Sequence, residues 1–328
     1  MSNYYRLFAE PKYGDKAPEV EIPPAENIDI NNPAVWRAKF HPESAAYILN
    51  LIRHNNVYDS IMTVPTTELY LKMRDGYMMH TRVYHPDGEG KHPVMLFIHG
   101  GAFMYNDLSI YDYVIRYLCK YSGAVIFAME YRLAPENKCP IGREDCYEAL
   151  EWVAEHAAEY GGDISSYTIC GDSAGGALTA SLALMARDRN GPKISKHMMI
   201  FPLTSFVLES RPYSELLYGN GGYFLSLDST NNFLNNVYFN DPAEAKDPYN
   251  SPLLSDNLKD LPDAIFYSAE CDPLLDQGLM YAAKLQDAGV NVEYHIYDGM
   301  IHGFINRAYQ KTYECLNQIC KDIPKLQD

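Results

Sequence analysis

The sequence predicts an α/β protein whose mostly parallel, doubly wound sheet of eight strands is covered by helices on both faces. Short apolar runs typical of buried strands alternate with stretches of helical periodicity from about residue 93 to the end of the chain. An antiparallel hairpin precedes this alternation, because two strand-like runs flank Asp75-Gly76, a dipeptide typical of tight hairpin turns.

The elements follow in order from these patterns. The segment 1–60 contains early prolines and then two amphipathic stretches, 33–40 and 43–52, which we expect to be helices that need a partner surface. Strands are expected at 67–74, 77–84, 93–98, 124–128, 167–170, 197–201, 264–268 and 292–296. Helices are expected at 109–121, 143–160, 177–187, 274–288 and 304–320.

One stretch interrupts the alternation. Residues 204–250 are rich in Tyr, Asn, Gly and Pro and contain no strand-helix pair. A loop of that length usually serves a function, and we expect a lid that packs on the N-terminal helices over the carboxyl ends of the strands. We therefore divide the chain into an N-terminal helical cap segment (1–60), a core in two parts (61–203 and 251–328) and a cap insertion (204–250).

Composition narrows the possible partners. The 328 residues carry 27 Lys and Arg against 43 Asp and Glu, a net charge of −16, and no basic run, which disfavours binding to nucleic acid or an anionic membrane. No secretory signal is evident, and no apolar run approaches the roughly 20 residues that span a bilayer. Seven scattered cysteines without CxxC spacing are typical of reduced thiols, so we expect a cytoplasmic location. The motifs do not specify an oligomeric state.

The first chemical motif is the turn Gly171-Asp172-Ser173-Ala174-Gly175, which lies between a predicted strand and a predicted helix. Small residues on both sides let the strand and helix approach closely, and the helix N-terminus favours developing negative charge at the serine. The pattern predicts a nucleophilic Ser173. A glycine-rich turn could also cradle a phosphate or simply change the direction of the chain, so the other loops must decide.

A second motif, His99-Gly100-Gly101-Ala102-Phe103, follows the strand at 93–98. Ligands of doubly wound sheets bind at the carboxyl ends of strands, where this loop and Ser173 both lie. Adjacent glycines let backbone N–H groups turn toward one point, as stabilisation of an oxyanion requires. We expect the N–H groups of Gly100, Gly101 and Ala174 to form an oxyanion hole. The alternative is a plain glycine turn.

Two further strand ends supply an acid and a base. Asp272 follows the strand at 264–268, and His302 lies on the loop after the last strand. Asp272 is preferred over Asp276, which falls within the next helix, and Glu270 is a possible substitute. The order serine, acid, histidine along the chain is that of α/β-hydrolases.

These motifs together resemble those of the hormone-sensitive-lipase-like family of α/β-hydrolase esterases, from about residue 67 to the end. The resemblance implies the α/β-hydrolase fold and a helical cap made of the N-terminus and the insertion. The chain departs from the family pattern in three places. Ala102 replaces a third glycine, Asn106 replaces a common glycine, and Ile141-Gly142 follow Pro140 where the family has two alanines. The matching segments are His99 to Ala102, Gly171 to Gly176, Asp272 to Leu274, His302 to Phe304, Glu130 to Glu136, and the acidic pair Asp107 and Asp112.

The predicted reaction is two-step acyl transfer by a serine carboxylesterase that acts on small esters with short to medium acyl chains, without a metal or organic cofactor. An amidase or peptidase with the same triad is an alternative. A ligand-binding receptor on a hydrolase fold is disfavoured because all three triad residues are present. A purely structural role would leave the Ser173 turn unexplained.

The sequence says less about the substrate. A capped site favours short soluble esters over long-chain triglycerides. Several apolar and aromatic side chains could line an acyl or alcohol pocket, or could instead hold the cap on its core. They are Phe103, Met104, Tyr105, Tyr213, Tyr218, Tyr223 and Phe224.

Overall fold

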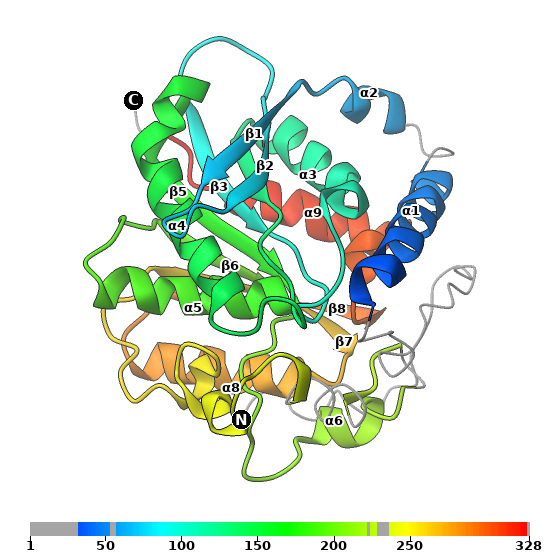
Figure 1. Cartoon of the computed structure of the whole chain (residues 1–328), viewed down its shortest axis with the longest axis vertical. Helices are drawn as coiled ribbons and strands as arrows, with labels where there is room; N and C mark the ends of the chain where they lie inside the picture. Colours follow the sequence, from blue (N-terminus) through cyan, green and yellow to red (C-terminus); the bar gives the residue numbers. More distant parts are fainter. Residues whose placement is uncertain (1–31, 53–56, 222–223, 228–235, 327–328) are drawn as a thin grey trace.

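One eight-stranded sheet forms the centre of the molecule in a computed structural model that describes residues 32–52, 57–221, 224–227 and 236–326 (Figure 1). The strand order is β1-β2-β4-β3-β5-β6-β7-β8, and only the β1–β2 and β2–β4 pairs are antiparallel. The strands are β1 (Thr66–Lys72), β2 (Met78–Tyr84), β3 (His92–Ile98), β4 (Val125–Met129), β5 (Gly162–Asp172), β6 (Lys196–Ile200), β7 (Asp263–Cys271) and β8 (Val292–Ile301).

Helices surround the sheet. The α-helices are α1 (Pro33–Ile52), α2 (Tyr58–Met62), α3 (Leu108–Ser122), α4 (Ile141–His156), α5 (Ala174–Asp188), α6 (Tyr213–Tyr218), α8 (Leu275–Asp287) and α9 (Gln310–Asp322). Short 3₁₀ turns are η3 (Ala157–Tyr160), η4 (Pro242–Lys246), η5 (Pro252–Leu254) and η6 (Phe304–Asn306). Among the described residues no helix is long and apolar enough to cross a membrane.

Two hydrophobic clusters cover the two faces of the sheet, and the side chains of β3 alternate between them. Leu96 packs in the cluster that contains residues of α4, α5 and α8, whereas its neighbour Phe97 packs with residues of α1, α3 and α9. This period of two is what an extended strand buried on both faces requires. The predicted doubly wound α/β fold is confirmed.

The predicted hairpin is confirmed, with Lys72 paired to Met78 across the turn. Two helix predictions are wrong. The stretches 33–40 and 43–52 form one helix that continues through Pro42, and its second half packs on α3 through the buried Ala45 and Ile48. The last helix begins at Gln310 instead of 304, because Arg307 adopts an extended backbone after η6.

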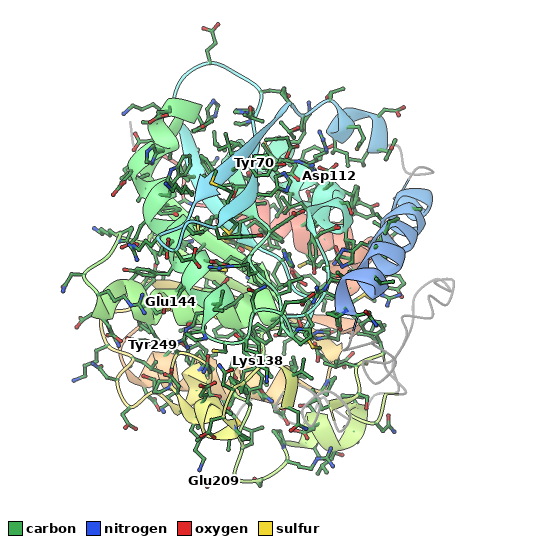
Figure 2. All side chains as sticks on the ribbon, viewed as in Figure 1. Tyr70, Asp112, Lys138, Glu144, Glu209 and Tyr249 are labelled. Carbon is green, nitrogen blue, oxygen red and sulfur yellow. The ribbon has the colours of Figure 1, made fainter. Side chains whose placement is uncertain are left out.

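The insertion is tied to the core by hydrogen bonds at both ends. Its helix α6 packs on α8, where Ser214 bonds to Asp276. Near its end, Lys138 Nζ donates to the carbonyl of Phe239 at 2.9 Å (Figure 2 labels Lys138). Packing of the insertion on the N-terminal helices, and the division into cap and core segments, stay predictions. All seven cysteines are free thiols.

Candidate active site

Ser173 lies at the sharp turn between β5 and α5. Its backbone angles, φ 53° and ψ −116°, are ones that side-chain-bearing residues rarely adopt. The turn depends on glycine: a Cβ on Gly175 would lie 2.0 Å from the Ile98 carbonyl oxygen, and one on Gly171 would lie 2.5 Å from the Gly175 oxygen. The backbones around the turn therefore lie too close together to leave room for a side chain at either glycine. Helix α5 starts directly after the serine.

A hydrogen-bonded chain connects Ser173, His302 and Asp272. His302 Nε2 lies 2.8 Å from Ser173 Oγ, and His302 Nδ1 lies 2.7 Å from Asp272 Oδ2. The other carboxylate oxygen of the buried Asp272 accepts the Leu274 N–H at 2.8 Å, which fixes its orientation. A carboxylate beside Nδ1 selects the tautomer in which Nδ1 donates and Nε2 accepts the serine proton.

The two competing carboxylates have other partners. Glu270 accepts the Gly299 N–H at 2.6 Å, and Asp276 accepts the Ser214 N–H at 2.9 Å. The carboxylate in contact with His302 is that of Asp272. No motif singled out Phe201, whose ring packs against the His302 ring with centroids 4.8 Å apart. Its one signal is its position directly after β6.

The prediction that Gly100 donates to an oxyanion is wrong in this geometry. Its N–H donates to Asp172 Oδ1 at 2.8 Å and lies 3.2 Å from the Tyr111 hydroxyl. The N–H groups of Gly101, Ala102 and Ala174, by contrast, donate to no protein acceptor within the described ranges. On the loop after β3, the N–H groups without a protein acceptor are therefore those of Gly101 and Ala102, one residue later in the chain than the predicted pair.

Asp172 is the acceptor that occupies Gly100. This carboxylate is fully buried, and burial raises its pKa to about 6, although hydrogen bonds from Tyr111 and Gly100 oppose the shift. The Tyr111 hydroxyl donates to Asp172 Oδ2 at 2.8 Å. Asp172 thus joins the end of β5 to the loop after β3 and to α3. The sequence signal for Asp172 is a charged residue directly before Ser173, since acids are almost never fully buried without such partners.

The predicted pocket residues do not share one environment. Phe103 is buried and stacked on Tyr238 with ring centroids 4.3 Å apart, and Met104 is also buried. Phe224 is 37% exposed, and its ring lies 3.4 Å from where a Cβ on Gly303, next to His302, would be. Tyr223 lies outside the described residues. For the rest, Tyr218 is buried, Tyr105 is half-buried and Tyr213 is exposed.

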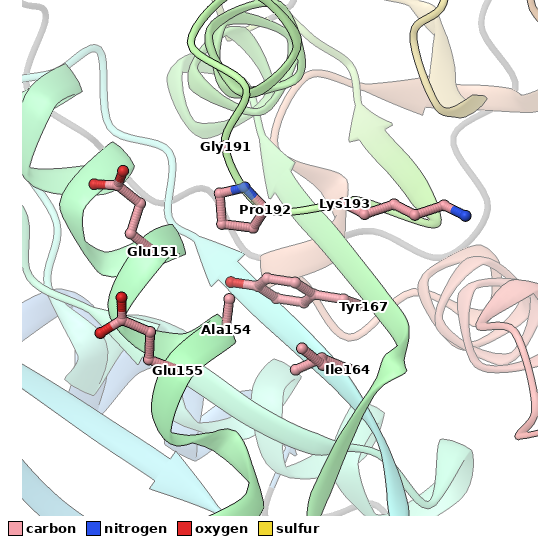
Figure 3. Close-up of a pocket in the computed structure, with 8 residues that line it drawn as sticks. All are labelled: Glu151, Ala154, Glu155, Ile164, Tyr167, Gly191, Pro192 and Lys193. Atoms are coloured by element: carbon pink, nitrogen blue, oxygen red, sulfur yellow. The ribbon is translucent and has the colours of Figure 1, made fainter.

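A cavity of about 320 Å³ lies far from this site. It opens between α4, the start of β5 and the loop at Pro192, as Figure 3 shows. Of its β5 residues, Ile164 lies near the opposite end of the strand from Ser173, and Tyr167 lies at the middle of the strand. No group of three or more His, Cys, Asp or Glu that could hold a metal ion occurs among the residues the structure describes.

Known proteins resemble this chain in sequence and in fold. Residues 95–306 match the family described as having the alpha/beta hydrolase fold. Carboxylic ester hydrolase LipN of Mycobacterium tuberculosis is 36% identical over 69% of this chain, which spans only 60% of that relative. The ethyl acetate hydrolase of Pseudomonas putida is 34% identical over 73% of this chain and 75% of its own length.

A solved structure agrees over a longer stretch. The esterase of the archaeon Pyrobaculum calidifontis superposes with a TM-score of 0.79 at 33% identity, covering 89% of this chain and 92% of that one. The match includes both halves of the predicted core. The chain belongs to the hormone-sensitive-lipase-like family of α/β-hydrolase esterases.

Proposed function

We propose that this protein is a serine carboxylesterase in which Ser173 is the nucleophile, His302 the general base and Asp272 the orienting acid. The observation that carries the proposal is the continuous chain of two short hydrogen bonds from Ser173 through His302 to a buried carboxylate. Hydrolases of the family, including those named above as esterases, support the reaction class. No metal or organic cofactor takes part.

The reaction proceeds in two steps. His302 Nε2 removes the Ser173 proton as Oγ attacks the ester carbonyl, and Asp272 stabilises the imidazolium that forms. The oxyanion accepts hydrogen bonds from the N–H groups of Gly101, Ala102 and Ala174, which have no competing protein acceptor in the described residues. The imidazolium then protonates the leaving alcohol. Water attacks the acyl-enzyme by the same route and releases the acid.

The proposed substrates are small esters with short to medium acyl chains. The P. putida relative is named for ethyl acetate, a short ester. Among the candidate pocket residues on or beside the proposed catalytic loops, Phe224 next to Gly303 is partly exposed and Tyr105 is half-buried, whereas Phe103 and Met104 are buried. Seven free thiols support a cytoplasmic location.

The test is hydrolysis of p-nitrophenyl esters from acetate to palmitate, with a p-nitroanilide in parallel. We expect turnover that is highest at short to medium chains, negligible anilide cleavage, and loss of activity in Ser173→Ala. Anilide cleavage that exceeds ester cleavage would favour the amidase alternative. A folded protein that hydrolyses no ester would contradict the proposal.

A further inference from the structure

Helix α1 reaches the loop that carries two of the proposed oxyanion donors, residues 100–106, hereafter the oxyanion loop. Arg37 Nε donates to the Met104 carbonyl at 2.6 Å, and Nη2 donates to the Ala134 carbonyl at 2.5 Å. The same guanidinium pairs with both carboxylate oxygens of Glu136, at 2.7 and 2.9 Å. Only 14% of the Arg37 side chain is exposed, so its two bonds to the backbone carbonyls are partly buried, whereas the Glu136 carboxylate is 37% exposed.

One turn further along the same helix, His41 holds the end of the oxyanion loop. Its Nε2 accepts the Asn106 N–H at 3.0 Å, and its Nδ1 lies 2.9 Å from Asp107 Oδ2. Because Nε2 accepts, the ring is neutral in this arrangement and Nδ1 donates to the carboxylate. Asp107 in turn caps α3 by accepting the Ser109 N–H at 2.9 Å. The ring therefore links the helix to the junction of loop and α3.

The oxyanion loop is a backbone that needs such support. Gly101 has φ 122°, and three residues with side chains, Ala102, Phe103 and Asn106, have φ 50°, 61° and 75°. Side chains disfavour this left-handed region, so the conformation persists only where its surroundings determine it. From the core side, the Ala134 N–H donates to the Phe103 carbonyl at 2.9 Å, and Arg37 contacts the next carbonyl along the loop as well as that of Ala134.

We infer that α1 positions the oxyanion loop, with Arg37 and His41 as positioning residues for the N–H groups of Gly101 and Ala102. This inference rests on the proposed function. Donors that stabilise an oxyanion act on the transition state and hardly on the bound ester, so displacing them lowers kcat more than it raises KM. The helix that precedes the core thus contributes to the chemistry of a site built more than sixty residues later in the chain.

The first experiment compares Arg37→Ala with two controls on the same helix. Val35 is 71% exposed, so Val35→Ala tests substitution on α1 alone, and Ile48→Ala loosens the buried packing of the helix without touching the oxyanion loop. We expect Arg37→Ala to lower kcat about 10- to 100-fold, with KM changed less than about threefold. Val35→Ala should match the wild type. If Arg37→Ala leaves kcat unchanged or affects only KM, or if Val35→Ala lowers kcat as much, the inference is wrong.

The second experiment separates the two bonds of His41. Glutamine places an acceptor near the position of Nε2, whereas asparagine places a donor near that of Nδ1. We expect His41→Gln to retain more kcat than His41→Asn, since only the former keeps an acceptor for the Asn106 N–H. The reverse order would show that the contact with Asp107, and hence capping of α3, is what matters, and would contradict the role assigned to the loop.

Two further readouts test the inference, and the second of them does not depend on ester turnover. A trifluoromethyl ketone forms a tetrahedral oxyanion on the serine, so its Ki should rise in Arg37→Ala by the same factor as kcat/KM falls. Amide hydrogen exchange in the peptide that contains residues 100–106 should be faster in Arg37→Ala than in Val35→Ala. Unchanged exchange and Ki would overturn the positioning role. A wild type that hydrolyses no ester would overturn the proposed function, whereas faster exchange in Arg37→Ala would still support the positioning of the oxyanion loop by α1.

Discussion

In the proposed mechanism Asp272 acts through the His302 ring that it orients, which gives its substitution a distinct signature. Asp272→Asn presents an amide to His302 Nδ1 and so favours the wrong tautomer, and we expect kcat to fall about 10³- to 10⁴-fold with a measurable residue of activity. Glu270→Gln retains an oxygen for the Gly299 N–H and should stay within about twofold of the wild type. Steady-state kinetics on a p-nitrophenyl ester decides. Wild-type activity in Asp272→Asn together with loss in Glu270→Gln would reverse the assignment of the acid.

Asp172 predicts a pH dependence of stability. Its pKa is raised to about 6 in the folded state, from about 4 in an unfolded chain, so the folded state holds this proton more tightly. The contribution of this group to stability is full below about pH 4 and is lost as the pH rises through 6. Compared with pH 4, the contribution of this group to the free energy of unfolding is lower by up to about 3 kcal/mol at pH 7.

The matched variant is Asp172→Asn, whose amide oxygen can still accept the Gly100 N–H while the Tyr111 hydroxyl turns to accept from the amide nitrogen. In urea unfolding between pH 4 and 8, we expect the difference between variant and wild type to grow in favour of the variant as the pH rises through 6. A difference that does not change with pH, or a variant that is less stable throughout, would show that the carboxylate is better solvated or paired than its burial suggests.

Residue by residue, the sequence predicted the parts of the site that follow from position along a strand. Ser173, Asp272 and His302 each lie at or just beyond a strand's carboxyl end, which identifies them without knowledge of the fold's details. Gly100 was misassigned because its N–H is occupied by an acceptor 72 residues away. Spacing within a motif carries no information about such a partner.

At the scale of elements, α6 is fixed to the segment that carries the proposed acid. The fully buried Ser214 donates from Oγ to the Pro273 carbonyl at 3.0 Å and accepts the Asp276 N–H at 3.1 Å. Pro273 directly follows Asp272, so this contact connects α6 to the orientation of the proposed acid.

Ser214→Ala should therefore lower both stability and turnover. It leaves two buried backbone groups without this partner, at a cost of about 1–3 kcal/mol in the free energy of unfolding. We also expect lower kcat through a less restrained Asp272. Leu216→Ala is the control, because Leu216 lies on the same helix with 60% of its surface exposed. Denaturant unfolding and kinetics are measured together, and equal behaviour of the two variants would contradict the proposed coupling.

The elements that the sequence predicted least well are those whose limits depend on distant packing. Pro42 lacks a backbone N–H, and local rules end a helix there, yet α1 continues because Ala45 and Ile48 are buried against the rest of the molecule. Local periodicity likewise cannot show that Arg37 and His41 project onto the oxyanion loop. Those contacts exist only after α1 has docked.

For the molecule as a whole, the sheet brings separate segments to one edge. Strands β1, β2 and β4 lie on one side of β3, and the chain then crosses to β5 on the other side. The loops after β3 and β5 therefore meet where the strand order reverses. Such a reversal is where open α/β sheets bind ligands. The pairs β5–β6, β6–β7 and β7–β8 are parallel, so Asp272 after β7 and His302 after β8 lie at the same edge of the sheet as Ser173. This is why the alternation of strands and helices sufficed to predict both the fold and the neighbourhood of the site.

The central claim is that Ser173 forms an acyl-enzyme, and intact-protein mass spectrometry tests it most directly. The protein is treated with a p-nitrophenyl carbamate, whose carbamoyl group leaves the serine slowly, and the modified peptide is sequenced. We predict the addition of one carbamoyl group per chain, located on Ser173, with stoichiometric release of p-nitrophenol, and no addition in Ser173→Ala. Modification at another residue, or equal modification of Ser173→Ala, would contradict the account.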